Sequence, residues 1–152
     1  MISRKKNIAP AILAGLIGLA LIACVPLGCQ SQGPLVAKAA SPIADVPMPV
    51  GFKMKESNSR SWNSGSLRFV DYLYSGSGGR VPAVEFFEKQ MPISGWVSLS
   101  KQFTQGRSTL DFAKADEKCR IIIYKPGALY PTYIQIAIWV TVHPKTRTTD
   151  KH

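Results

Sequence analysis

The stretch Tyr133-Ile134-Gln135-Ile136-Ala137-Ile138-Trp139-Val140-Thr141-Val142 decides the fold class of this chain. From Ile134 to Val142, every second residue is an aliphatic β-former. Successive side chains of a strand point to opposite faces of a sheet. The alternation therefore predicts a strand whose aliphatic face lies in the core, with Gln135 and Thr141 on the other face.

The segments before this stretch supply the rest of the predicted sheet. A weak first strand lies between Phe52 and Trp62, and 67–74 is a clear strand rich in aromatic residues and β-formers. Short turns between the later strands make them antiparallel neighbours. These later strands are 96–104, with Val97, Leu99 and Phe103 on one face, 109–114, with Leu110 and Phe112 on one face, and 119–124.

One helix is predicted between the second and third strands. Pro82 suits a first helical turn, and Val84, Phe87 and Met91 recur at helical spacing. Pro92 and the glycine at 95 end the helix. The predicted order is β-β-α-β-β-β-β, and the predicted class is α+β: a twisted antiparallel sheet with a single helix packed on one face.

The amino-terminal 30 residues have the layout of an export signal. Arg4, Lys5 and Lys6 precede a run without charges from Asn7 to Leu27. Basic residues before an apolar run hold the amino end in the cytoplasm. The run could stay as a membrane-spanning helix, be cut at Ala23 to release the chain, or direct lipid to a cysteine. Each outcome places the folded part outside the cytoplasm.

The end of this run, Leu21-Ile22-Ala23-Cys24, resembles the lipobox of bacterial lipoproteins. The resemblance implies a diacylglyceryl thioether on Cys24, cleavage before it, and a fatty acid such as palmitate on the new amino terminus. Several acyl chains hold a protein firmly on a membrane, whereas one does not. Cys29 is the alternative site, because a polar linker follows it, although Pro26 departs from the pattern. Val25, where inner-membrane lipoproteins carry Asp, implies the outer membrane of a Gram-negative cell.

Composition predicts how the chain is divided. Proline at 34, 42, 47 and 49, among alanine and serine, favours an extended spacer that lifts a domain from the membrane. The predicted parts are a signal peptide with lipobox at 1–23 (to 28 if Cys29 is the site), a Pro/Ala/Ser-rich tether at 24–50, an α+β domain at 51–143 and a basic tail at 144–152.

Candidate residues for chemistry are sparse, and we expect no catalytic, cofactor-binding or metal-binding residue. His143 and His152 lie in the tail, and Glu85 and Glu88 lie on the wet face of the helix. The glycine-rich stretch 75–80 precedes the helix, where phosphate-binding loops occur. It lacks their motif, so a flexible connection is favoured over an anion site.

Two residues leave alternatives open. Cys119 is predicted to be a buried free thiol, or to form a disulfide with whichever of Cys24 and Cys29 carries no lipid. Asp71 is predicted to lie on the exposed face of its strand, opposite a core face formed by Arg68, Val70, Tyr72 and Tyr74. If Asp71 were instead buried, it would need a partner such as arginine.

The net charge of +10 favours anionic partners. Nucleic acid is not expected to meet an exported, anchored chain. The aromatic residues that could stack on bases or sugars are expected to be core or half-buried sheet residues instead. They are Trp62, Tyr72, Tyr74, Tyr124 and Trp139.

The function predicted from these features is an exported, membrane-anchored lipoprotein with a small non-catalytic domain that binds another cell-envelope component through its sheet face or an edge strand. The alternatives are a single-pass anchored protein with the same domain, or a basic domain that binds anionic polymer or the membrane surface. An enzyme acting on envelope substrates is the least supported. The stretch 86–96, with Met-Pro ending a helix and Gly-Trp opening a strand, resembles small uncharacterised domains of bacterial envelope proteins. There, Met91 and Trp96 would seal the helix against the sheet.

Overall fold

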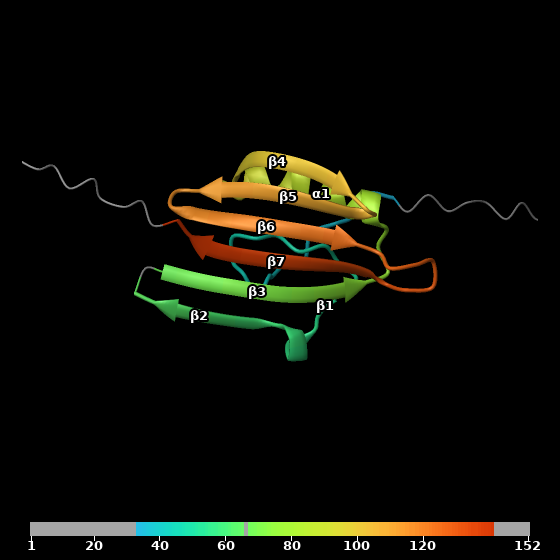
Figure 1. Ribbon diagram of the computed structural model, residues 1–152, viewed down its shortest axis with the longest axis horizontal. Helices are drawn as coiled ribbons and strands as arrows, with labels where there is room; N and C mark the ends of the chain where they lie inside the picture. The colour runs from blue at the N-terminus through green and yellow to red at the C-terminus, as the bar shows by residue number, and fades with distance from the viewer. Residues whose placement is uncertain (1–32, 66, 142–152) are drawn as a thin grey trace, which may run out of the picture. The chain divides into compact units, whose positions relative to one another are not determined.

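The computed structural model describes residues 33–65 and 67–141 (Figure 1). Within them one antiparallel sheet runs in the order β1-β3-β7-β6-β5-β4, and β2 also pairs with β3. One α-helix packs on it, which confirms a mixed α+β class. The elements are β1 (Phe52–Met54), the 3-10 turn η1 (Glu56–Asn58), β2 (Arg60–Ser64), β3 (Leu67–Gly76), α1 (Arg80–Ile93), β4 (Val97–Thr104), β5 (Arg107–Lys114), β6 (Glu117–Tyr124) and β7 (Thr132–Val140).

The predicted element order is wrong at its start, because the segment 52–62 forms two strands. β1 and β2 pair with successive parts of β3, and η1 separates them. The Ser59 hydroxyl accepts the Leu73 N–H at 3.0 Å and donates to the Lys55 carbonyl at 2.8 Å. Between β1 and β2, where no described strand pairs with this side of β3, the Ser59 side chain therefore replaces a backbone carbonyl as the partner of the Leu73 N–H. The helix follows three strands, and the order is β-β-β-α-β-β-β-β.

The strand predicted at 133–142 lies inside the sheet as β7. β7 pairs with β3 on one side and with β6 on the other. Ile134, Ile136 and Ile138 are fully buried, as predicted, whereas Val140 is only partly buried and ends the strand. Val142, the histidines at 143 and 152, and the predicted basic tail lie outside the described residues.

The helix covers the part of the sheet that contains β4 and β5 (Figure 1). Its predicted core positions Val84, Phe87 and Met91 are all buried. The Trp96 N–H bonds to the Met91 carbonyl at 3.1 Å, and both side chains are buried. This confirms that Met91 and Trp96 close the helix against the sheet.

Residues 35–50, expected to form a spacer, instead pack on the same face of the sheet. Ile43, Val46 and Met48 belong to the main core cluster, and Leu35 packs against it. A bridge pairs Ala37 with Pro49 and closes the segment into a loop. The domain therefore begins before the predicted boundary at Gly51, because apolar side chains that lie between the prolines of this segment complete the core.

An ionic cluster fastens this segment to the sheet. The Asp45 carboxylate accepts hydrogen bonds from Arg68 at 2.8 and 2.9 Å and from Lys114 at 3.0 Å. Arg68 also donates to Glu117 at 2.7 Å, and the Trp96 indole N–H donates to the Asp45 carbonyl at 2.8 Å. Burial alone would raise the pKa of Asp45, but the bonds from Arg68 and Lys114 outweigh it and hold that pKa below its usual range.

A β-bulge between Ser98 and Ser100 changes the predicted faces of β4. Val97, Leu99 and Phe103 were expected to share one face, but Val97 pairs with Ala113 and Phe103 with Ser108, which lie on opposite faces of β5, and all three apolar side chains are exposed. One extra residue shifts the alternation on one side of a bulge relative to the other. The strand therefore presents apolar side chains to solvent.

The Cys119 thiol is fully buried and free. Burial raises its pKa to about 12, so almost none is thiolate at neutral pH. In a chain of residues 33–152, where Cys119 is the only cysteine, we expect no reaction with a thiol reagent such as DTNB until the protein is unfolded. Labelling of the native protein within minutes would contradict this burial.

Candidate functional site

The face of the sheet opposite α1 and residues 35–50 forms the candidate site, and it faces the viewer in Figure 1. Register pairing places Ser100, Asp111, Arg120 and Ala137 side by side on the neighbouring strands β4, β5, β6 and β7. Hydrogen bonds link the first three. Ser100 Oγ donates to Asp111 Oδ2 at 2.8 Å, and Arg120 Nε donates to Asp111 Oδ1 at 2.7 Å.

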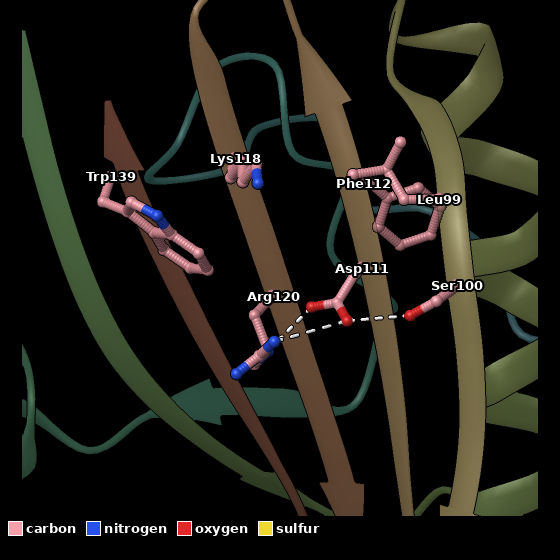
Figure 2. A pocket seen from close by; sticks show the side chains of 7 residues that line it. All are labelled: Leu99, Ser100, Asp111, Phe112, Lys118, Arg120 and Trp139. Carbon is pink, nitrogen blue, oxygen red and sulfur yellow. Dashed lines mark hydrogen bonds and ion pairs between the residues drawn. The ribbon is translucent and has the colours of Figure 1, made fainter. Parts of the chain in front are cut away.

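A hollow of about 160 Å³ lies beside this row of side chains, and we call it the β4 hollow (Figure 2). Figure 2 shows the Asp111–Arg120 pair along one side and Trp139 and Leu99 on opposite sides. The Arg120 guanidinium carbon lies 5.8 Å from the centre of the Trp139 ring. The lining residues are Leu99, Ser100, Asp111, Phe112, Lys118, Arg120 and Trp139.

The charges around the β4 hollow are unequal. Burial alone would raise the pKa of Asp111, but hydrogen bonds from Arg120 and Ser100 and the nearby charges of Arg120 and Lys118 hold that pKa below its usual range. Asp111 is therefore a stable carboxylate that is already neutralised by Arg120. Lys118 has no ion-pair partner within the described part of the chain, so the β4 hollow carries a surplus positive charge.

Asp71 occupies the same face on β3. Its carboxylate accepts hydrogen bonds from Arg60 Nη2 at 3.3 Å and from Gln135 Nε2 at 3.0 Å. Val70 and Tyr74, one and three positions from Asp71 along the strand, are buried on the opposite face. The prediction that Asp71 lies on the face away from the core is confirmed, although its side chain is only partly exposed.

The predicted aromatic residues divide between the two faces. Tyr74 is buried, and Tyr72 packs against the core. Trp62 stacks on Phe69 with ring centres 6.1 Å apart, and Tyr124 stacks on Tyr133 at 5.2 Å. These rings lie on the open face together with Trp139, where neighbouring rings or guanidinium groups cover part of their surface.

The glycine-rich loop before α1 serves packing. A Cβ added at Gly76 would lie 2.6 Å from the Gly51 carbonyl oxygen and 2.7 Å from the Phe52 ring, and one at Gly78 would lie 2.7 Å from that ring. Glycine is therefore needed there for the close approach of Phe52. Glu88, on the helix, pairs with Lys101 of β4 at 2.8 Å.

The outer edge of β4 has no neighbouring strand in the described part of the sheet. Val97, Leu99 and Phe103 leave 66%, 53% and 62% of their surface exposed along this strand. The β4 hollow lies next to this edge, because Leu99 and Ser100 belong to both. The outer edge of β4 and a cationic hollow thus lie side by side.

Sequence reasoning missed this arrangement. None of Ser100, Asp111, Lys118 and Arg120 was predicted as a site residue, because each is an ordinary polar position of a strand. Their register across the sheet brings them together. Cys24 and Cys29, the predicted lipidation sites, lie outside the described residues.

Within residues 33–65 and 67–141, no three His, Cys, Asp or Glu side chains gather as metal ligands would. In that same part, no helix combines the length and the apolarity required to cross a membrane. Comparisons with protein-family models, with curated proteins and with solved structures find no match for this chain.

Proposed function

We propose that this chain is an exported, membrane-anchored lipoprotein whose domain binds another protein of the cell envelope without catalysing a reaction. The anchor is supported by the charged start, the apolar run and the lipobox resemblance at 21–24. The binding role is supported by the apolar outer edge of β4, which pairs with no other strand among the described residues.

The β4 edge carries the binding proposal. An exposed strand edge presents free backbone N–H and C=O groups, and soluble proteins usually shorten, charge or cover such edges. β4 is eight residues long, and three large apolar side chains are exposed along it. An extended segment of a partner protein can add to such an edge through backbone hydrogen bonds.

A different protein suits this edge better than a second copy of the chain. Lys101 lies near the middle of β4, so two β4 strands paired around their centres would bring two lysines together. The chain carries a net charge of +10, which favours a partner with acidic groups.

The length of chain between the proposed anchor and the domain limits where the partner can lie. Eleven positions along the chain separate Cys24 from Leu35, the first described residue that packs against the core. Fully extended, that length spans at most about 40 Å. A domain anchored at Cys24 would therefore meet partners in the membrane or close to it.

Binding of an anionic polymer or of the membrane surface is the second candidate. Arg107 and Lys118 are exposed on the open sheet face, and no ion pair within the described residues uses them. This mode would weaken steeply as salt rises, whereas strand addition to β4 would not. Salt dependence therefore distinguishes the two candidates.

Intact mass of the protein extracted from membranes tests the anchor. We expect a mass equal to residues 24–152 plus acyl chains, lost in Cys24→Ser and kept in Cys29→Ser. Loss only in Cys29→Ser would move the site to Cys29. An unmodified full-length mass would overturn the lipoprotein proposal and leave a membrane-spanning helix as the anchor.

Crosslinking in intact cells tests the β4 edge. A photoreactive amino acid replaces Phe103 on β4 or, as control, Trp62 on the opposite edge, which is similarly exposed at 56%. We expect one discrete protein adduct from position 103, formed in the same yield when irradiation is carried out at high salt, and none from position 62. Equal adducts from both positions, or none from position 103, would contradict strand addition at β4.

A further inference from the structure

We propose that the β4 hollow is a subsite for an acidic side chain, best a glutamate, carried by the partner strand that pairs with β4. This inference rests on the proposed function, because it assumes that a polypeptide adds to the β4 edge. It adds the chemistry by which the partner is chosen.

The position of the β4 hollow suits this role. Side chains of an added strand alternate between the two faces of the extended sheet. Those on the open face would lie beside Ser100, which forms part of the wall of the hollow. In strand addition, backbone bonds supply affinity and pockets for alternate side chains supply specificity. A side chain reaching across Ser100 would enter the β4 hollow.

The size and walls of the β4 hollow suit one side chain. Its volume of about 160 Å³ is below the range of roughly 300–1,000 Å³ typical of pockets for drug-sized ligands. Trp139 and Leu99 offer apolar surface on opposite sides (Figure 2). Lys118 and Arg120 lie on β6, two strands in from β4, so the longer glutamate reaches toward them better than aspartate, and its methylene groups can pack on Leu99.

Charge selects an acid over other side chains. Asp111 already binds Arg120 and Ser100, so it does not offer a free carboxylate to an incoming lysine or arginine. Lys118 and Arg120 would repel such a cation, and the Lys118 amine remains without an ion pair in the described residues. A carboxylate entering the β4 hollow would supply the missing partner.

A small probe tests the subsite apart from strand addition. The probe is N-acetyl-glutamate N-methylamide, titrated at low salt into ¹⁵N-labelled protein and followed by NMR, with the glutamine analogue as comparison. We expect millimolar binding of the glutamate probe, with shifts confined to the backbone amides of Ser100, Lys118 and Arg120 and to the Trp139 indole N–H. The glutamine probe should produce no saturable shift at these positions.

Charge reversal provides the matched control. Lys118→Glu should weaken binding of the glutamate probe about tenfold, because it replaces an attraction with a repulsion. Lys53→Glu changes the net charge equally at an exposed lysine on β1, near the other edge of the sheet, and should leave binding unchanged. Equal weakening by both variants, or equal binding of both probes, would overturn the subsite.

The two proposals fail in different ways. No probe binding together with a position-103 adduct would overturn the acidic subsite and leave strand addition standing. If the glutamate probe binds but position 103 gives no adduct, the proposed function is overturned. The β4 hollow would then bind only small carboxylates, and the proposal that it holds a partner's side chain would also be overturned.

Discussion

Removal of residues 1–50 is expected to leave a chain that does not fold, although the composition of the sequence places the start of the domain at Gly51. Ile43, Val46 and Met48 are buried in the core. Each such side chain contributes about 1.5–3 kcal/mol when buried, so together they contribute about 5–9 kcal/mol. That is comparable with the total free energy of unfolding of a small domain, about 5–15 kcal/mol.

Circular dichroism and urea unfolding of chains 33–152 and 51–152 measure this effect. The longer chain should unfold cooperatively, because it keeps the complete core and the Asp45 cluster. The shorter chain should show no cooperative transition, since it exposes the sheet surface that residues 35–50 cover. Equal urea midpoints for the two chains would show that this segment is a spacer after all.

Replacement of Trp96 by alanine is expected to lower the free energy of unfolding by about 3–5 kcal/mol. The side chain is 1% exposed and lies where the end of α1, β5 and residue 45 meet. Its ring lies 5.7 Å from the Lys114 amine and 6.0 Å from the Arg68 guanidinium carbon. The substitution leaves a large cavity and also removes the indole N–H that donates a hydrogen bond to the Asp45 carbonyl.

Two further variants separate the contributions of Trp96. Trp96→Phe keeps most of the packing but leaves the Asp45 carbonyl without this donor, which should cost about 1–3 kcal/mol. Trp62→Ala removes an exposed tryptophan on β2 and should cost no more than about 1 kcal/mol. Urea unfolding of chain 33–152 carrying Trp96→Ala, Trp96→Phe or Trp62→Ala measures the loss in free energy of unfolding for each variant. Similar losses at Trp96 and Trp62 would contradict a sealing role for Trp96.

Residue periodicity explains which parts of the fold were predictable. In β7, the apolar residues at every second position marked a core face, and Ile134, Ile136 and Ile138 are buried as expected. In α1, Val84, Phe87 and Met91 followed the helical repeat. A regular element repeats its environment along the chain, so a local pattern is sufficient to detect it.

Other parts had no local pattern to detect. Ile43, Val46 and Met48 follow no regular period, and the prolines around them suggested an open chain. The β4 bulge consists of one extra residue, which leaves the alternation visible but turns Val97 and Leu99 to solvent. The split between β1 and β2 depends on a bond from Ser59 to a neighbouring strand.

The candidate site was hidden for the same reason. The residues of the β4 hollow come from four strands and lie together only through antiparallel register. In the sequence, Asp111 is an ordinary polar position of a strand. Only the fold places Arg120 and Ser100 beside it. The lipidation prediction at Cys24 or Cys29 depends on local sequence alone and stays a prediction.

The sequence by itself determined the α+β class, the helix and its buried face, and the core faces of β5 and β7, because these depend on repeats of two or 3.6 residues. Tertiary structure alone decided that residues 35–50 belong to the core, that β4 is an exposed edge, and that Lys118 and Arg120 lie beside Trp139. Those features depend on which strands become neighbours, and neighbours in a sheet are chosen by packing over the whole domain.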